Sequence, residues 1–600
     1  MGVTGGVSGD HGRRTPMMMV GMVVLLVATG APAGAFAAAP GTSATQEPAD
    51  LVILNAALWT GAETVRPEAR GRSAPTAVAV RDRTIAAVGD ADSVRPFVGP
   101  DTKVIDAAGR RVIPGMTDSH THIIGGGLQL ARLALREVRG REEFVAAVEA
   151  SAKTKGPGQW LLGGRWSVES WSQHEPPTKA WLDPVTNDVP VFLTRMDGHQ
   201  ALVNSAALRL AGIDANGPKD PVGGEIERDY ATGEPTGVLK ESAMDLVSRH
   251  IPEPAAEQRY QALLQAMKHA NALGVTSVHD MSSPSDLAIF RQALADDALS
   301  VRITSYVHYE DWLTHTEEVI ESGLDDRMVR VVGFKGYMDG SLGSRTAFMG
   351  EPYADAAAGE PYPRGQLTEF AQSEAAFRDA VAKVDALGLQ MAVHAIGDQA
   401  NHLLLNAYER AALRNKRGDA RHRVEHAQHL LVADIPRFAR LGVTASMQPY
   451  HKADDGRYAE AALGTARLAG SYAFRRLLDA GVLLCFGSDW PVVTMNPFAG
   501  IDSAVNARTL ADEVWLASHS ITIEEALRAY TVSPARAVHR EGRLGTIEVG
   551  KLSDLVILAD DPLTMPRERL GEVQVDMTIV GGRVVFSRPT DMPPGRPSGR

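Results

Sequence analysis

The sequence predicts an α/β protein whose main domain is a (β/α)8 TIM barrel, with a small β-sandwich domain formed from both chain ends. Two observations predict the barrel. Apolar runs of strand length alternate with helix-length segments over nearly four hundred positions, and polar residues follow the carboxyl ends of these runs. A closed cylinder brings such residues to one mouth, whereas the alternative, a doubly wound open sheet, spreads them apart.

The eight runs expected to form the barrel strands are VIPGMTD, GVTSVHD, VRITSYVHY, MVRVVGFKGYMD, LQMAVHAIGD, HRVEHAQ, GVTASMQP and VLLCFGSDW. They place the barrel domain at residues 115–539. Between the first and second runs, about residues 125–270 are too long for one crossover helix. We therefore predict an insertion there that shapes the substrate pocket.

The sequences on both sides of the barrel have the pattern of short β-strands. Residues 51–114 and 540–587 contain short alternating apolar runs separated by turn residues such as Gly, Asn and Asp. Because the two flanks resemble each other, we expect them to join in one composite β-sandwich domain.

The ends of the chain predict export. Residues 1–39 combine Arg13 and Arg14, an apolar run and small residues suited to cleavage, which is typical of a signal peptide. The route, Sec or twin-arginine, stays open, and the expected location is periplasmic or extracellular. The apolar run is short for a membrane span, so we expect no stable span after its removal. Residues 40–50 read as a linker and residues 588–600 as a disordered tail.

Composition narrows the function classes. The chain has 600 residues, 44% hydrophobic and 22% charged, as in large globular proteins, and its net charge of -12 offers no basic surface for nucleic acid. Cys485 is the only cysteine and lies in the apolar run VLLCFG, which excludes an internal disulfide and a multi-thiolate metal site. We expect a small-molecule substrate, and a homo-oligomer remains open.

The polar residues at the strand ends predict a metal site. His120 and His122 in TDSHTH are two apart, so on a strand they share a face and can bind one ion. Later runs add Lys335, His394, His426 and Asp489. Each one alone also fits a buried core residue or a helix cap. Their convergence at one mouth favours a divalent ion held by nitrogen and oxygen, with Zn2+ as the leading choice.

Four further residues are candidates for substrate binding. Asp197 and His199 lie in RMDGHQ, which a tight Asp-Gly turn explains equally well. Asp339 begins a glycine-containing loop and either orients substrate or caps the turn. Trp490, beside Asp489, either lines an apolar pocket or packs in the core.

Over about residues 50–586 the chain resembles the amidohydrolase superfamily, in particular its Amidohydro_3 branch, which includes N-substituted formamide deformylases. The resemblance rests on PGMTDSHTH, RMDGHQALVNS, FKGYMDGSLGSRTA, VHAIGD, RVEHAQ, GSDWPV and SPARAVHREGRLGTIEVGKLSDLVIL. It implies one ion bound by His120, His122 and Asp489, and a second bound by His394 and His426. It places Lys335 between the ions as a bridging carbamate, and an unmodified Lys335 would favour a single ion.

These residues predict a metal-dependent hydrolase, and the resemblance implies that it cleaves a linear amide C–N bond, other than a peptide bond, in an N-formyl or N-acyl amine. Metal-activated water attacks the carbonyl, and Asp489 acts as general acid and base. One alternative is a deaminase of a cyclic, nucleobase-like amidine, which prefers a single ion. Another is a barrel that binds without catalysis, against which the apparently complete set of ligands argues.

Overall fold

The computed structural model describes residues 47–62, 74–171, 173–309 and 327–589. The predicted signal peptide lies outside the described residues, as do most of the predicted linker and nearly all of the predicted tail. Within the described ranges, no helix has the length and apolar character needed to cross a membrane.

Eight parallel strands form one sheet in which sequence neighbours are also spatial neighbours. The strands are β7 (Met116–Thr121), β14 (Val275–Ser282), β15 (Arg302–His308), β16 (Val329–Tyr337), β17 (Gln390–Ala395), β18 (Arg423–His426), β19 (Thr444–Met447) and β20 (Leu484–Phe486). Backbone bonds from Asp489 to His120 (2.7 Å) and from His122 to Trp490 (2.9 Å) bring the last and first strands together. The predicted barrel is confirmed, and each predicted run supplies one of the eight barrel strands.

The seam where the last barrel strand, β20, meets the first, β7, requires a glycine at position 487. Gly487 directly follows β20, and a Cβ atom there would lie 2.5 Å from the amide nitrogen of His120 and 2.7 Å from Oδ1 of Asp118. The buried carboxylate of Asp118 also accepts hydrogen bonds from the amide nitrogen of Ser488 (2.8 Å) and from its hydroxyl (2.5 Å). Gly487 therefore allows the close approach, and the hydrogen bonds to Asp118 hold β7, which contains His120, against the segment after β20 that contains Asp489.

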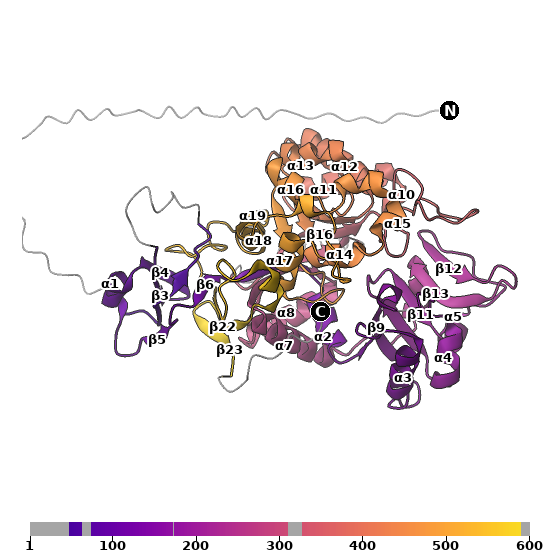
Figure 1. Ribbon diagram of the computed structural model, residues 1–600, viewed down its shortest axis with the longest axis horizontal. Coiled ribbons are helices and arrows are strands. Elements are labelled where there is room, and N and C mark those ends of the chain that lie inside the picture. Colours follow the sequence, from indigo (N-terminus) through magenta and orange to yellow (C-terminus); the bar gives the residue numbers. More distant parts are fainter. Residues whose placement is uncertain (1–46, 63–73, 172, 310–326, 590–600) are drawn as a thin grey trace, which may run out of the picture. The chain divides into compact units, whose positions relative to one another are not determined.

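Helices alternate with the barrel strands (Figure 1). The main ones are α2 (Ile123–Gln129), α7 (Ala256–Ala272), α8 (Pro284–Ala295), α11 (Glu374–Ala386), α12 (Asp398–Asn415), α13 (Ile435–Leu441), α14 (Pro449–Asp455), α16 (Phe474–Asp479), α17 (Pro497–Asn506), α18 (Ile523–Tyr530) and α19 (Val532–Ala537). In α12, Ala400, Leu404, Tyr408 and Ala411 recur at helical spacing and are buried. This apolar face joins the core that surrounds the barrel.

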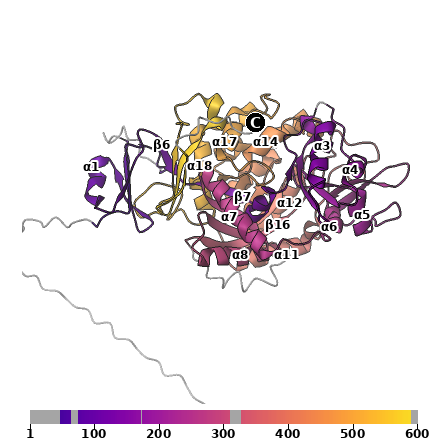
Figure 2. The same cartoon turned by 90° about the horizontal axis from the view of Figure 1, so that it is seen from below.

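The segment between β7 and β14 contains a second, six-stranded sheet. Its order is β12 (Gly224–Arg228), β13 (Pro235–Glu241), β11 (Gln200–Val203), β10 (Val191–Arg195), β9 (Leu161–Trp166) and β8 (Leu133–Ala134). Helices α3 (Arg141–Ala152), α4 (Lys179–Thr186), α5 (Ser205–Ala211) and α6 (Asp245–Ser248) accompany it (Figure 2). The sheet has an apolar cluster around Trp166 and another around Leu239. The range expected for the insertion reaches residue 270, but α7 already packs on α2 and β14 of the barrel.

Both ends of the chain contribute to a five-stranded sheet, in which β2 (Ala57–Leu58) and β6 (Arg111–Pro114) lie beside β21 (Leu555–Leu558), β22 (Val575–Val580) and β23 (Arg583–Ser587). A four-stranded sheet, from β1 (Leu51–Leu54), β3 (Ala77–Arg81), β4 (Thr84–Gly89) and β5 (Lys103–Asp106), comes from the first end alone. Apolar residues of both sheets, such as Val80 and Ile557, share one cluster. The composite β-sandwich domain itself stays a prediction.

Candidate metal centre

Three residues place potential metal ligands close together at the C-terminal end of the barrel strands. His120 lies in β7, His426 ends β18, and Asp489 follows β20. Two imidazole nitrogens and one carboxylate oxygen from these buried residues lie within 4.8 Å of one another. They meet because parallel strands present their carboxyl ends at the same rim of a barrel.

Hydrogen bonds behind the two imidazoles direct their free nitrogens. His120 Nδ1 lies 2.6 Å from Oε2 of Glu425, and His426 Nδ1 lies 2.8 Å from Oε1 of Gln448. Each oxygen accepts the Nδ1 proton, which leaves Nε2 of the neutral ring as the atom that can bind an ion. Nε2 of His120 accordingly lies 3.5 Å from Oδ1 of Asp489.

Two of these residues have an uncommon backbone conformation. His426 has a φ angle of 73° and Asp489 has one of 59°, both in the left-handed region. Few residues other than glycine adopt this region, although aspartate, asparagine and histidine do so more often than the rest, and such conformations cluster at functional sites. The geometry at the strand ends is therefore held by the surrounding fold, including the seam bond from Asp489 to His120.

The charge states of these groups suit a divalent cation. Burial lowers the pKa of His120 to about 4 and that of His426 well below its ordinary value, so both rings are neutral. Burial opposes the ionisation of Asp489, but its contacts with the surrounding histidines, including a hydrogen bond from His122, hold the pKa of Asp489 well below its ordinary value. Two neutral imidazoles and one carboxylate are ligands that Zn2+ and similar ions accept, so the residues present fit a metal.

Two other predicted ligands lie beside this group. His122 Nε2 is 3.4 Å from Oδ1 of Asp489. The ring of His394 lies 4.4 Å from that of His426, but its Nε2 is 3.0 Å from the carbonyl oxygen of Gly340. Its ligation of an ion stays a prediction and would use the other ring nitrogen or a shift of the ring.

Lys335 is buried at the same rim. Its Nζ lies 3.1 Å from Nε2 of His120 and 4.8 Å from the ring centre of Tyr337. No described carboxylate forms an ion pair with this ammonium group. Burial lowers the pKa of Lys335 to about 8. Because the amine occupies the lone pair with which His120 would bind an ion, metal binding requires Lys335 to move or to change chemically.

Beneath the ligands lies a buried polar layer around Arg423, Glu425 and Ser446, three residues that sequence reasoning missed. Arg423 donates to Glu425 Oε1 (2.7 Å) and to the Ser446 hydroxyl (2.7 Å), and it lies 2.7 Å from Nδ1 of His279. Arg423 and Glu425 are two apart on β18, so they share a face that points into the barrel. The sequence did contain a signal for this layer. In RVEHAQ two opposite charges lie two positions apart in a predicted barrel strand, which places both side chains on one face.

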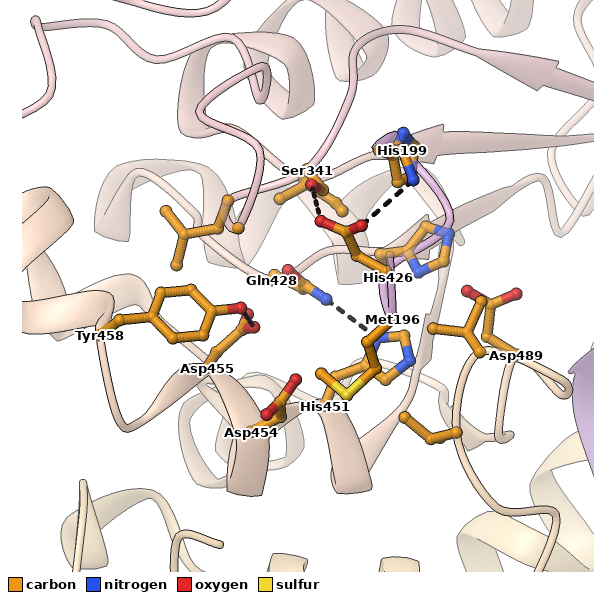
Figure 3. Close-up of a pocket in the computed structure, with 16 residues that line it drawn as sticks. Met196, His199, Ser341, His426, Gln428, His451, Asp454, Asp455, Tyr458 and Asp489 are labelled. Carbon is orange, nitrogen blue, oxygen red and sulfur yellow. Dashed lines mark hydrogen bonds between the residues drawn. The ribbon is translucent and has the colours of Figure 1, made fainter. Parts of the chain in front are cut away.

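A cavity with an empty volume of about 400 Å³ opens beside the ligands (Figure 3). His426 and Asp489 line it together with His451 of α14. The His451 ring is stacked 6.2 Å from that of His426, and its Nδ1 lies 3.2 Å from Nε2 of Gln428. Sequence reasoning missed His451, whose only signal was its place shortly after a barrel strand.

Asp197 and His199 of the insertion lie in the turn between β10 and β11 and line the same cavity. Asp197 accepts a hydrogen bond from the Ser341 hydroxyl (2.7 Å), and the His199 ring lies 5.1 Å from that of His394. Burial opposes ionisation of both, but Arg195 holds the pKa of Asp197 at about 2, and Glu241 raises the pKa of His199 to about 9. Both predicted residues therefore reach the cavity as charged groups.

Asp339 and Trp490, the other two predicted substrate-binding residues, are not in the lining of this cavity. Both oxygens of Asp339 accept backbone hydrogen bonds, among them one of 3.0 Å from Ile396. The indole of Trp490 stacks 5.4 Å from the ring of His269 and covers Gly126. Loop anchoring and core packing, the other interpretations of these residues, fit their positions better.

An eight-stranded parallel barrel with histidine and aspartate ligands at its C-terminal rim defines a metal-dependent hydrolase of the barrel class. More narrowly, the chain belongs to the amidohydrolase family, which it matches over residues 103–586. The resemblance inferred from the sequence motifs is thereby confirmed.

Similar proteins extend over most of the chain. Protein LONG AFTER FAR-RED 3 of Arabidopsis thaliana is 36% identical over 554 residues, 90% of this chain and 92% of that protein. N-substituted formamide deformylase of Arthrobacter pascens is 30% identical over 554 residues, covering 90% and 98%. The crystal structure of an uncharacterized metal-dependent hydrolase from Pyrococcus horikoshii OT3 superposes with a TM-score of 0.68 at 25% identity, covering 86% and 99%.

Proposed function

We propose that this protein hydrolyses the C–N bond of a linear amide, other than a peptide bond, in an N-formyl or N-acyl amine. The observation that carries the proposal is the buried group of His120, His426 and Asp489, whose ligand atoms lie within 4.8 Å of one another. The likeness to N-substituted formamide deformylase supports a linear amide over a ring.

His120, His426 and Asp489 would hold the divalent ion, with zinc as the proposed metal. When bound, such an ion supplies Lewis-acid activation of water and of a carbonyl group. Asp489 takes the proton of the attacking water on its carboxylate and returns it to the departing nitrogen. The Glu425 and Gln448 contacts keep Nε2 of each histidine unprotonated throughout.

The cavity walls fit an amide with an apolar substituent. Met196, Leu342, Val492 and Val493 line the cavity that also contains Asp489. Apolar side chains at this position receive the carbon skeleton of the substrate, and the nearby polar atoms orient its amide group. The cavity therefore offers apolar contacts to the carbon skeleton of an N-formyl or N-acyl amine and polar contacts to its amide group.

The test combines metal analysis with a substrate screen. We expect purified protein to contain a divalent metal and to release amine from N-formyl or N-acyl amines. Asp489→Asn should lower kcat by about 100-fold or more, the range found for loss of a general acid–base group. The metal content of this variant is measured in parallel, so that lost catalysis is separated from lost metal.

Two outcomes would contradict the proposal. Release of ammonia from cytosine or adenine, with no linear amide cleaved, would assign the site to a deaminase. A metal-loaded protein that binds amides but turns over none of them would favour the barrel as a binding protein.

A further inference from the structure

A second cavity, with an empty volume of about 880 Å³, lies next to the first, and Met196 lines both. Its walls carry Arg136 and Arg457, together with Ser167, Glu169 and Tyr450. Met196 therefore lies between the cavity that contains Asp489 and the cavity that contains these arginines.

Arg136 has no carboxylate partner among the described residues. Its Nη1 donates to the carbonyl oxygen of Val492 (3.0 Å), and its guanidinium lies 5.7 Å from the ring centre of Tyr450. Its Nη2 is buried without a hydrogen-bond partner. Val492 lines the first cavity together with Asp489, so the guanidinium group of Arg136 borders the first cavity.

Arg165, from β9 of the insertion, lies behind the residues between the two cavities and is in the lining of neither. Its Nη1 donates weakly to the carbonyl oxygen of Met196 (3.4 Å), and its Nε is buried without a hydrogen-bond partner. A Cβ atom at Gly198 would lie 3.6 Å from Nη1 of Arg165 and 3.9 Å from Cγ2 of Val492. Arg165 therefore approaches the same segment that Arg136 contacts.

Three other arginines of this region have carboxylate partners. Arg195 pairs with Glu169 (3.1 Å), and Arg139 pairs with Glu137 (3.2 Å). Arg457 pairs with Asp454. Arg136 and Arg165, in contrast, form no ion pair with any described carboxylate. Burying like charges without a partner costs free energy that a bound anion would offset.

We propose that Arg136 and Arg165 form a subsite for an anionic group carried by the substrate, a carboxylate, while the amide lies at Asp489. The guanidinium fork matches carboxylate geometry and binds it by charge-assisted hydrogen bonds. The inference rests on the proposed amide hydrolysis and narrows it to N-formyl or N-acyl amines that bear an acid.

The test compares 4-(formamidomethyl)benzoate with its methyl ester, which has the same skeleton and no charge. For the wild-type protein we expect kcat/KM to favour the acid by about tenfold or more, as for hydrogen bonds to charged groups. Arg136→Gln and Arg165→Gln should each reduce this preference, mainly through KM, and the double variant should abolish it. Arg136→Lys should retain part of it.

Arg209→Gln is the matched control. Arg209 belongs to α5 of the same insertion, is exposed, and pairs with Asp188 at 3.5 Å. We expect this variant to keep the wild-type preference, which excludes a general effect of net charge. Thermal unfolding of every variant shows whether a changed preference reflects a folded protein.

Failure of this inference is distinguishable from failure of the proposed function. Equal turnover of acid and ester by the wild-type protein, or an acid preference that survives in the double variant, would overturn the subsite alone. If neither compound is hydrolysed, calorimetry measures the binding of the acid and of the ester to the wild-type protein and to the double variant. Binding of the acid but not of the ester, lost in the double variant, would support the subsite, and absence of acid binding would overturn it.

Discussion

The carboxylate of Glu425 lies 2.6 Å from Nδ1 of His120, and both side chains are buried beneath the barrel mouth. Glu425 also accepts a hydrogen bond from Arg423 (2.7 Å). Burial opposes its ionisation, but Arg423 and His120 outweigh this and lower the pKa of Glu425. The charged carboxylate therefore fixes the ring of a proposed metal ligand and is itself fixed by a buried arginine.

Glu425→Gln is expected to weaken metal binding by about 10- to 100-fold, the usual effect of losing a partner behind a metal-bound histidine. The amide is uncharged and a weaker acceptor for the Nδ1 proton, and it leaves Arg423 without its carboxylate. Competition with a chelator of known affinity measures the change, and thermal unfolding measures the accompanying loss of stability.

Glu513→Gln is the control for this experiment, because Glu513 is exposed and remote in sequence from the predicted ligands. It should leave both metal affinity and unfolding unchanged. Undiminished metal affinity in folded Glu425→Gln would show that His120 does not depend on this contact.

Lys335 is expected to carry a carbamate in the metal-loaded protein. Its buried amine forms no ion pair with a described carboxylate and faces Nε2 of His120 at 3.1 Å. Addition of CO2 would turn a competing cation into an anionic oxygen ligand that can bridge to a second ion near His394. Native mass spectrometry should find the mass of one CO2, lost on acid treatment, and ¹³C-bicarbonate should give a carbamate resonance. Fully metallated protein with unmodified Lys335 would instead support a single-ion site.

Gly487→Ala is expected to destabilise the protein by about 1 to 3 kcal/mol, as overpacking does in a close-packed interior. The new Cβ would meet the His120 amide nitrogen at 2.5 Å and Oδ1 of Asp118 at 2.7 Å, both on the opposite strand. Unfolding in urea measures the loss. Gly418→Ala is the control, because no atom lies within 4 Å of a Cβ there. Equal stability of the two variants would mean that the seam tolerates a wider spacing.

The barrel and its rim residues could be predicted because strand length and spacing are local signals. Each predicted run became a strand, and His120, His426 and Asp489 lie at the rim where polar residues after parallel strands meet. One run differs from its prediction: VIPGMTD is not a single strand but divides at Gly115, the first residue of the predicted barrel domain, with β6 in the terminal sheet and β7 in the barrel. A Cβ at Gly115 would lie 2.2 Å from the Thr276 hydroxyl, a tertiary contact that sequence spacing does not reveal.

The parts of the site that escaped prediction depend on contacts between distant segments. Gln448 acquires its role from His426, 22 positions away, and Glu425 acquires its role from His120, 305 positions away. Asp339 shows the converse case. It has the residue type and the position of a substrate ligand, yet backbone amides from two other segments occupy its oxygens. Residue type at a strand end limits the chemistry, and tertiary hydrogen bonds decide whether that chemistry is available.

Lys452 predicts a specific dependence of stability on pH. It lies buried on α14, with Nζ 3.4 Å from the carbonyl oxygen of Leu516 and 5.9 Å from the ring centre of Phe474. Burial lowers its pKa from 10.5 to about 7. Between these two values the folded protein binds fewer protons than the unfolded chain, so this group makes stability rise with pH. Below pH 7 the full cost of burying the charge is present.

Lys452→Met removes this charge from a site that accommodates a flexible apolar chain. We expect the variant to be more stable than wild type at pH 6, by an amount on the order of a few kcal/mol at about 1.4 kcal/mol per pKa unit. The advantage should shrink steadily toward pH 10, where the wild-type lysine is neutral in the folded state. Unfolding in urea at a series of pH values measures the difference between the two proteins. Lys383→Met, at an exposed lysine paired with Asp379 at 2.8 Å, should give no such trend. An advantage for Lys452→Met that stays constant from pH 6 to pH 10 would show that it comes from packing and not from the buried charge.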